Sequence, residues 1–286
     1  MRTESAGSEV GYAMRRDLHG KRIIITGASS GIGRALAEAA AAEGARIALA
    51  ARSTDKLEEL ARSLSARGSD VIAVPTDVTC EADRRRLLDT VVERFGGLDV
   101  LINNAGIGSH GHFADSSEAI LRQIMEVNFF APAELTRLAI PILMKGRQPA
   151  IVNISSMCGR RGVPAWPEYS ASKFGLCGFT EALRGEMARF DIDVLLVVPG
   201  LTRTDLGNNL LRSKGRMKIA FESGMPPATV ARKILQALKK NRSEIVLGTE
   251  ARWLLRLNRF LPRLVDWILI RHVGRLYANE TPVEHT

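Results

Sequence analysis

Tyr169 and Lys173 are a pair whose residue types and spacing could carry proton chemistry. They stand four positions apart in Glu168-Tyr-Ser-Ala-Ser-Lys173, a spacing that places two side chains on one face of a helix, one turn apart. A free phenol has a pKa near 10, so it exchanges protons poorly at neutral pH (roughly one in a thousand is ionised). A neighbouring ammonium is expected to lower that pKa and bring the phenol into working range. The pair alone is weak evidence, because solvated helix faces carry many such pairs by chance.

The segments that must position this pair alternate between two patterns. Apolar runs predict strands at 22–26, 46–50, 71–75, 100–103, 150–155, 194–198 and 244–247, and helical periodicity separates them, as at 31–43 and 174–190. Continuous apolar strands alternating with helices indicate a parallel sheet covered on both faces. The chain has 286 residues, 45% of them hydrophobic, which is enough for one large core. We therefore expect a single domain with a doubly wound α/β fold.

A cluster of glycines lies where the first strand meets the first helix, in Thr26-Gly-Ala-Ser-Ser-Gly-Ile-Gly-Arg34. Glycines permit a tight turn there, and the N-terminus of the helix offers free N–H groups to a pyrophosphate. The spacing Gly-x-x-x-Gly-x-Gly differs from the Gly-x-Gly-x-x-Gly of the standard dinucleotide fingerprint, and alone it could be a simple turn. Its place after the first strand favours a nucleotide cofactor.

Taken together, the motifs resemble the short-chain dehydrogenase/reductase family over roughly residues 21–247. The matching pieces are Thr26-Gly27 to Gly33, Asp77-Val78, Asn103-Asn-Ala-Gly106, Asn128, Asn153-Ile-Ser-Ser156, Tyr169 to Lys173 and Pro199-Gly200. The resemblance implies a Rossmann sheet of about seven parallel strands. It also implies hydride transfer between a nicotinamide cofactor and a carbonyl or secondary alcohol, in a homodimer or homotetramer.

The resemblance further implies which residues form the site. Tyr169 would exchange the proton, Lys173 would lower its pKa and bond the nicotinamide ribose, and Ser156 would polarise the substrate oxygen. Asn128, expected in a helix, would hold a water that links Lys173 to solvent. Ser155 competes for the serine role, but Ser156 has the family's spacing of thirteen residues to Tyr169. The cofactor would be bound by Gly27, Ser29, Ser30, Gly31, Ile32, Gly33, Arg34, Arg52, Asp77, Val78, Asn104, Ala105, Gly106, Tyr169, Lys173, Pro199, Gly200, Thr202 and Thr204.

The end of the second strand favours NADP over NAD. Where an NAD enzyme places an acid on the ribose diol, about 20 residues beyond the glycines, this chain has Ala50-Ala-Arg52-Ser. A guanidinium at Arg52 suits a 2′-phosphate, and Arg34 could grip it from the other side. Both arginines could equally be ordinary surface residues. Asp55, the nearest acid, is expected to cap or begin the following helix.

Cysteines and histidines give no sign of a metal site. Cys80, Cys158 and Cys177 are odd in number and lack metal-ligand spacing, which suits a reducing cytoplasm without disulfides. His110 and His112 have no third ligand at suitable spacing, so pocket-edge contact or plain surface is expected for them. Residues 1–18 contain no long apolar run and are expected to be a disordered extension.

The net charge of +9 is concentrated at the end of the chain. After position 204 there are fifteen Lys or Arg and seven Asp or Glu. The excess lacks the aromatic interleaving of a nucleic-acid surface, so we expect no nucleic-acid partner. The catalytic domain is expected at 19–249, with a mobile substrate lid at 205–227. The lid mixes apolar and basic side chains and suits either a lipophilic ligand with an anionic head or a solvated surface: Leu206, Leu210, Leu211, Met217, Ile219 and Phe221 with Arg212, Lys214, Arg216 and Lys218.

Residues 250–286 are expected to form a basic amphipathic extension. Between 252 and 277 apolar residues recur at helical spacing among arginines, and Pro262 should kink or divide the helix. The arginines and Asp266 exclude a transmembrane span. An arginine-rich helix with tryptophans can lie in a membrane interface, or its apolar face can pack on the body or on a partner subunit. The sequence slightly favours packing.

The function predicted from these motifs is NADP-dependent oxidation or reduction of a lipophilic alcohol or carbonyl compound, in the cytoplasm or at a membrane surface. The alternative is a non-catalytic NADP-binding scaffold or redox-sensing regulator. A broken Tyr169, Lys173 or Ser156 would have favoured that alternative, and all three are intact.

Overall fold

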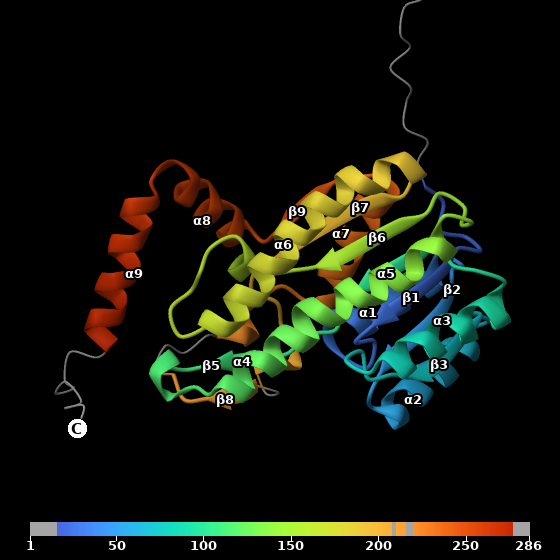
Figure 1. The fold of residues 1–286 in the computed structure, drawn as a ribbon, viewed down its shortest axis with the longest axis horizontal. Helices are drawn as coiled ribbons and strands as arrows, with labels where there is room; N and C mark the ends of the chain where they lie inside the picture. Colours follow the sequence, from blue (N-terminus) through green and yellow to red (C-terminus); the bar gives the residue numbers. More distant parts are fainter. Residues whose placement is uncertain (1–15, 208–209, 216–219, 277–286) are drawn as a thin grey trace, which may run out of the picture.

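A seven-stranded parallel sheet runs through the protein (Figure 1). The computed structural model describes residues 16–207, 210–215 and 220–276. The strands are β1 (Arg22–Thr26), β2 (Arg46–Ala51), β3 (Val71–Pro75), β4 (Val100–Asn103), β6 (Ala150–Ile154), β7 (Asp193–Pro199) and β9 (Glu244–Leu247). Their spatial order is β3-β2-β1-β4-β6-β7-β9, and every neighbouring pair is parallel. This confirms the doubly wound α/β fold.

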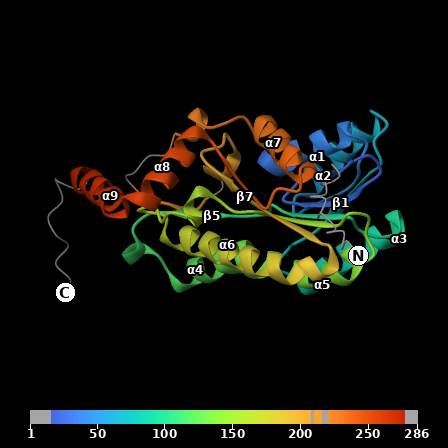
Figure 2. The ribbon, with the colours of Figure 1, turned by 90° about the horizontal axis from the view of Figure 1, so that it is seen from above.

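Helices cover both faces of the sheet, which explains why its strands read as continuous apolar runs. Ile23 and Ile25 of β1 belong to the core under α1 (Gly31–Ala42), α2 (Thr54–Ser65) and α7 (Pro227–Lys239). Ile24 points the other way, because side chains alternate along a strand, into the core under α3 (Glu81–Phe95), α5 (Ala131–Leu143) and α6 (Pro167–Met187). Figure 2 shows these two helical layers above and below the sheet.

The strand order reverses between β1 and β4, since β2 and β3 extend from one side of β1 and the later strands from the other. In an open parallel sheet, such a switch point leaves a crevice at the carboxyl ends of the strands. The glycine-rich turn after β1 and Asn104 after β4 both lie at this edge.

The first described residues are buried, although the sequence placed 1–18 in a disordered extension. Arg16 is 1% exposed and Leu18 is fully buried. The Arg16 guanidinium donates to the Leu238 carbonyl at 2.6 Å and to Asn241 Oδ1 at 2.7 Å, and it pairs with Asp193 Oδ2 at 2.6 Å. These partners fix the chain before residue 18, so that boundary was wrong. Residues 1–15 lie outside the described part.

The expected lid contains a strand that the sequence did not reveal. β8 (Leu210–Ser213) pairs in parallel with β5 (Gly108–His110), forming a separate two-stranded sheet. Short 3₁₀ turns at Asp205–Gly207 and Phe221–Ser223 flank it. The lid residues Arg216, Met217, Lys218 and Ile219 lie outside the described part.

The C-terminal extension forms two helices, α8 (Thr249–Phe260) and α9 (Pro262–Leu276), which meet at Pro262 as predicted. Ala251 and Val265 are buried, whereas Trp253, Phe260, Trp267 and Ile270 are more than half exposed. In Figures 1 and 2, α9 projects away from the sheet. Within the described ranges, every helix is too short or too polar to span a bilayer.

Candidate active site

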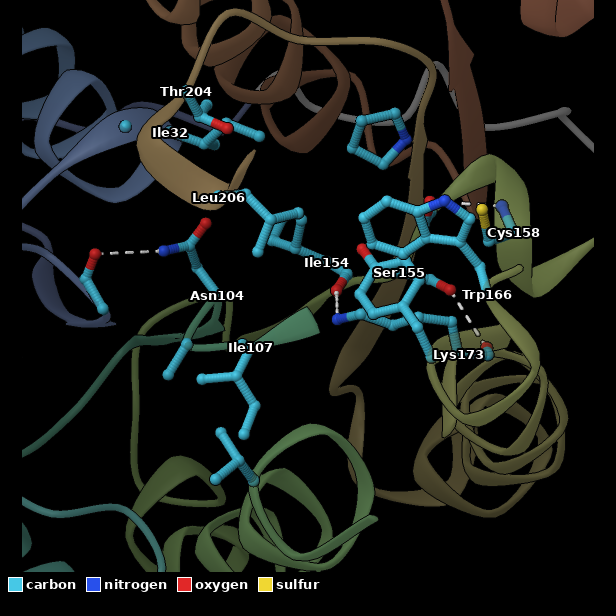
Figure 3. Close-up of a pocket in the computed structure, with 18 of the residues that line it drawn as sticks. Ile32, Asn104, Ile107, Ile154, Ser155, Cys158, Trp166, Lys173, Thr204 and Leu206 are labelled. Carbon is cyan, nitrogen blue, oxygen red and sulfur yellow. Dashed lines mark hydrogen bonds between the residues drawn. The ribbon is translucent and has the colours of Figure 1, made fainter. Parts of the chain in front are cut away.

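A cavity of about 1740 Å³ lies at the carboxyl ends of the strands. That exceeds the roughly 300–1,000 Å³ of a typical ligand pocket, so it can hold a dinucleotide with a second molecule beside it. Figure 3 shows Trp166 and Lys173 on one side and Ile32, Asn104 and Thr204 across from them. The predicted residues that line it are Gly27, Ser29, Ser30, Gly31, Ile32, Arg52, Asp77, Val78, Asn104, Ala105, Gly106, Ser156, Tyr169, Lys173, Pro199, Gly200, Thr202 and Thr204.

The turn between β1 and α1 requires glycine for steric reasons. Gly27 has φ +65°, and a Cβ added there would lie 2.9 Å from Ala105 Cα. A Cβ at Gly33 would lie 2.2 Å from the Gly27 carbonyl oxygen, so Gly33 serves the packing of the helix on the turn without itself lining the cavity. Asn104 Nδ2 donates to the Thr26 carbonyl at 2.8 Å and braces the same turn. The first turn of α1 therefore faces the cavity, an arrangement suited to an anion.

Tyr169 and Ser156 meet at the wall of the cavity. Pro167 begins α6, a first-turn position that suits proline, and Tyr169 follows in the same turn, 8% exposed. Ser156 ends the loop after β6, and its Oγ accepts a hydrogen bond from Cys158 N at 3.1 Å. Burial raises the pKa of Tyr169, and a hydrogen bond with Ser156 acts in the opposite direction.

The sequence suggested that Lys173 lowers the pKa of Tyr169, but in this structure burial outweighs any such effect. Its Nζ donates to the Ile154 carbonyl at 3.0 Å and lies 5.8 Å from the centre of the Tyr169 ring. Burial dominates at both groups: it raises the pKa of Tyr169 and lowers the pKa of Lys173 to about 8. The two side chains lie close together, and burial is the main influence on the pKa of each.

Ser155 serves the scaffold. Its Oγ donates to the Lys173 carbonyl at 3.0 Å (Figure 3). The same oxygen lies 3.1 Å from Cys177 Sγ. The hydroxyl thereby ties the end of β6 to α6, whereas the Ser156 hydroxyl accepts from Cys158 N within its own loop. The geometry agrees with the preference for Ser156 over Ser155.

Asn128 lies in a helix, as expected, and within it in a π-helical turn, Glu126–Phe130, between α4 (Glu118–Met125) and α5. It is fully buried and does not line the cavity. Its amide accepts from Ile107 N at 2.9 Å, and donates to the Ile107 carbonyl at 2.9 Å and to Ser172 Oγ at 3.0 Å. A Cβ added at Gly106 would lie 3.3 Å from Asn128 Oδ1 and 3.5 Å from Lys173 Nζ, so Asn128 and Lys173 flank the same backbone. π-Helical turns occur frequently at functional sites.

Arg52 and Arg34 separate in the structure. Arg52 is exposed and lines the cavity at the end of β2. Arg34 pairs instead with Glu38 at 3.2 Å and Glu59 at 3.4 Å, and it is not a lining residue. The second cation at this end of the cavity is Lys56, which sequence reasoning missed. Its place in the first turn of α2, just after Arg52, could have indicated it.

Three further residues predicted to contact the cofactor have defined local geometry. Asp77 Oδ1 accepts from the backbone N–H of Thr79 at 2.9 Å and from its hydroxyl at 2.7 Å, which shapes the turn after β3. In the loop after β7, Thr202 Oγ1 donates to the Gly200 carbonyl at 3.1 Å. Thr204 packs over the glycine-rich turn, since a Cβ at Gly31 would lie 3.2 Å from its methyl group. These loops border the cavity from opposite sides of the sheet edge.

Comparison with known proteins shows which family shares this fold and these motifs. Residues 21–215 match the model of the family described as "short chain dehydrogenase". The chain belongs to this family of oxidoreductases.

Its relatives match over most of their length. Dehydrogenase/reductase SDR family member 7B of Bos taurus is 36% identical over 245 residues, 82% of this chain and 75% of the relative. The ketoacyl reductase HetN of Nostoc is 35% identical over 274 residues, 94% of each chain. Among solved structures, a short-chain dehydrogenase from Burkholderia phymatum in complex with NAD has a TM-score of 0.81 at 28% identity, covering 87% of this chain and 96% of that one. One from Burkholderia cenocepacia in complex with NADP has a TM-score of 0.73 at 28% identity, covering 83% and 100%.

Sequence reasoning on this short-chain dehydrogenase predicted Leu206, Leu211 and Phe221 as apolar lining but missed Trp166, which forms an aromatic wall beside Tyr169. Trp166 is 3% exposed and contacts Tyr169 edge-on, with ring centres 5.6 Å apart. It also stacks on His110 at 5.2 Å and contacts Phe221 at 6.3 Å. His110 is thus buried in β5, neither at the pocket edge nor on the surface. Other apolar lining residues continue this wall: Ile107, Leu121, Met125, Phe130, Met157, Val163, Leu206, Leu211, Leu254, Ile268 and Leu269.

The cavity therefore has two chemically different ends. One end is backbone, small residues and cations around Gly27, Gly31 and Arg52, and the other is aromatic and aliphatic around Trp166. Tyr169 lies on the cavity wall beside Trp166.

Proposed function

We propose that this protein transfers a hydride between NADP(H) and the carbonyl or secondary alcohol group of an apolar substrate. The observation that carries the proposal is that Ser156, Tyr169 and Lys173 line one cavity, which is large enough for cofactor and substrate together, with Lys173 Nζ 5.8 Å from the centre of the Tyr169 ring. The relatives of known structure in complex with NAD and with NADP support a nicotinamide dinucleotide.

The residues present fit such a cofactor. The tight turn at Gly27 and Gly33 leaves no room for a Cβ, and with the first turn of α1 it forms a cradle for a pyrophosphate. Asp77 and Val78 would border the adenine, and Thr202 and Thr204 the nicotinamide end. When bound, the dinucleotide supplies or accepts the hydride.

The protein's own residues would handle the proton. Ser156 would orient and polarise the substrate oxygen, and Tyr169 would donate its proton to that oxygen during reduction. The phenol is protonated at neutral pH, which is the form that donates, although burial raises its pKa and so makes it a weaker acid. Lys173 would pass a proton toward Tyr169 and bond the ribose. A water path past Asn128 would use the backbone of the π-helical turn, because the side-chain amide is already bonded to Ile107 and Ser172.

A preference for NADP is supported by the charges at the end of β2. Arg52, Ser53 and Lys56 line the cavity there, and two cations with a hydroxyl suit a 2′-phosphate. Arg34 is withdrawn from this role, since Glu38 and Glu59 already pair with it.

An apolar substrate is supported by the wall around Trp166, Phe221 and Leu254. A ring or acyl chain would bury its surface there, with its carbonyl at Tyr169. The name of the Nostoc relative, a ketoacyl reductase, agrees with a carbonyl on such a chain.

The exposed surfaces support two kinds of assembly. Phe130 is 49% exposed and Phe174 is 45% exposed; they stand near the start of α5 and on α6, and we propose that these helices form a homodimer or homotetramer interface. We further propose that the arginines and exposed tryptophans of α8 and α9 rest on an anionic membrane surface. Free cysteines fit the cytoplasmic side of such a membrane.

The test is a panel of ketones, aldehydes and secondary alcohols of increasing apolar size, assayed with NADPH, NADH, NADP⁺ and NAD⁺. We expect turnover with the NADP pair, rising as the substrate gains apolar surface. Tight NADPH binding without turnover anywhere in the panel would support the non-catalytic scaffold instead.

A further inference from the structure

Arg212 is a lid arginine that the fold has buried. It stands in β8 and is 7% exposed, although arginines are seldom buried unless paired. Its Nη1 donates to the His112 carbonyl oxygen at 2.6 Å, and its Nη2 lies 3.4 Å from Glu168 Oε1. The guanidinium therefore joins the lid strand to the loop after β5 and to the first turn of α6.

Glu168, the partner, immediately precedes Tyr169 in the chain. The Glu168 side chain is fully buried in the pair, and its carboxylate also accepts a short hydrogen bond from the Ser116 hydroxyl. One carboxylate thus links the lid strand, the segment before α4 and the helix that carries Tyr169. Since both charges are out of water, removing either one leaves the other buried without its counter-charge, which is strongly unfavourable.

The backbone next to the pair is shaped around it. Gly111 has φ +153°, and a Cβ added there would lie 3.0 Å from Arg212 Cζ, so glycine leaves the space that the guanidinium occupies. Gly111 N donates to the Ala165 carbonyl at 2.9 Å. Ala165 has φ +65°, a strained conformation for a residue with a side chain. This strained residue directly precedes Trp166, which packs on Tyr169.

We propose that Arg212 is a positioning residue whose pair with Glu168 latches β8 over the substrate end of the cavity. Leu211, its neighbour in the strand, lines the cavity. When the Arg212 side chain pairs with Glu168, the same strand therefore brings Leu211 into the apolar wall. Through Glu168 and the Gly111–Ala165 contact, the latch also fixes Tyr169 and Trp166. The name "substrate end" rests on the proposed function, whereas the latch is a property of the fold.

The latch should matter at one end of the cavity only. The partners of the pair, His112, Ser116 and Gly111, lie beside the aromatic wall, and the glycine-rich turn and Arg52 lie at the other end. Loss of the pair should therefore open the lid and weaken substrate binding while NADPH affinity stays within about twofold. A purely structural contribution would instead lower both affinities together.

The test compares Glu168→Gln and Arg212→Met with Glu222→Gln, a matched control at an exposed lid carboxylate. Trypsin cleavage after Lys214 is timed in NADPH-saturated protein, and kcat and KM are measured with an apolar carbonyl substrate. We expect Glu168→Gln and Arg212→Met to speed cleavage about tenfold or more and to raise KM by a similar factor, because breaking a buried pair costs several times the roughly 1.4 kcal/mol that a factor of ten represents. The control should match the unaltered protein.

The double variant Arg212→Met/Glu168→Gln keeps the test decisive if the single variants fail to fold. It removes both charges and leaves no unpaired one buried, so thermal stability should recover while the lid still cleaves fast. Unchanged cleavage and KM in folded variants would overturn the latch. The latch would also be overturned if, in the single variants, NADPH affinity and stability fell as KM rose, and all three recovered together in the double variant. If the unaltered protein turns over no substrate, cleavage alone still decides the latch, and only the proposed function fails.

Discussion

The phenol of Tyr169 is shielded from water, and this burial controls its acidity. Burial raises its pKa, and the Ser156 hydroxyl only partly offsets this. A phenol with a raised pKa is protonated at neutral pH but is a weaker acid than a free phenol, so efficient proton donation requires an interaction that lowers the pKa. Alcohol oxidation needs the phenolate, so under the proposed mechanism its rate should rise with pH.

Replacing Tyr169 with Phe should lower kcat by about 10²-fold or more, because the only change is loss of the exchanging proton. NADPH affinity should remain close to that of the unaltered protein, since the ring and its contact with Trp166 stay. Steady-state kinetics and an NADPH titration measure the two effects. Near-normal turnover in Tyr169→Phe would remove the phenol from the mechanism.

Lys173 should make stability depend on pH in a defined window. Burial lowers its pKa to about 8 from 10.5, so below pH 8 both the folded and unfolded chains carry the ammonium, and the folded chain bears the cost of burying it. Between the two values the unfolded chain binds more protons, so the free energy of unfolding should rise with pH, by at most about 1.4 kcal/mol per unit. Above that window the gain is complete.

The measurement is denaturant unfolding of cofactor-free protein and of Lys173→Met from pH 7.5 to 10.5. The difference between the two should shift by about 3 kcal/mol in favour of the unaltered protein as pH rises. A difference that is flat across this range would mean that the buried amine keeps an ordinary pKa.

Arg52 should set the cofactor preference. Arg52→Asp replaces attraction with repulsion at the site proposed for the 2′-phosphate and should weaken NADPH relative to NADH by about 10²-fold. Arg62→Asp is the matched control, because Arg62 lies on α2 with a side chain that is 74% exposed. Fluorescence titration of both cofactors gives the ratio. Equal binding of NADPH and NADH by the unaltered protein would contradict the preference.

At the scale of elements, the sequence predicted the strands and turns that have a local pattern of their own. It missed the features that depend on residues far away in the chain. The seven strands of the main sheet were visible as apolar runs, and the turn around Gly27 as a glycine pattern at a strand end. β5 and β8 are short and each depends on the other, so neither had a signal of its own. Arg34 was assigned to the cofactor from its place just after the glycines, although Glu38, four positions on in the same helix, is a partner that the sequence offered; Glu59, from a different helix, is not visible in local pattern. Lys173 and Tyr169 were paired correctly, but their burial, which sets both pKa values, could not be predicted from spacing.

The π-helical turn should depend on Asn128. Asn128→Ala leaves the Ile107 N–H and carbonyl without their side-chain partner in a buried site, and each orphaned group costs about 1–3 kcal/mol. We expect the free energy of unfolding to fall by about 2–4 kcal/mol, with turnover reduced as the backbone beside Lys173 loosens. Gln123→Ala, on the exposed side of α4, is the control and should change stability little. Urea unfolding compares the two variants, and equal free energies of unfolding would show that Asn128 does not stabilise the turn.

At the scale of the whole molecule, α8 and α9 present two different faces. Leu254, Ile268 and Leu269 line the cavity, while Trp253 and Trp267 are 69% and 56% exposed. Arg256 stacks on Trp253 and Arg271 on Trp267. The same helices therefore border the substrate end and display cations with aromatic rings outward, a combination suited to a headgroup region.

This surface should hold the protein on anionic vesicles. Full-length protein should co-sediment with phosphatidylserine-containing liposomes at low salt, and Trp253→Ser combined with Trp267→Ser should reduce the bound fraction about tenfold. Phe113→Ser is the matched control, because Phe113 is 59% exposed on a different part of the surface. Protein that stays in the supernatant, with an oligomeric state altered by the tryptophan changes, would show that α8 and α9 pack on another subunit.

The bonds of Arg16 have a consequence for how the chain acquires its shape during synthesis. Its partners Leu238 and Asn241 are made more than 220 positions later, as the separations of 222 and 225 show. An emerging chain can assemble β1, β2 and β3, but it carries this guanidinium without those partners until α7 has left the ribosome. Contacts this distant in sequence form slowly. The final closure of the domain, and with it full resistance to proteolysis, therefore comes after translation has passed the last strand of the sheet.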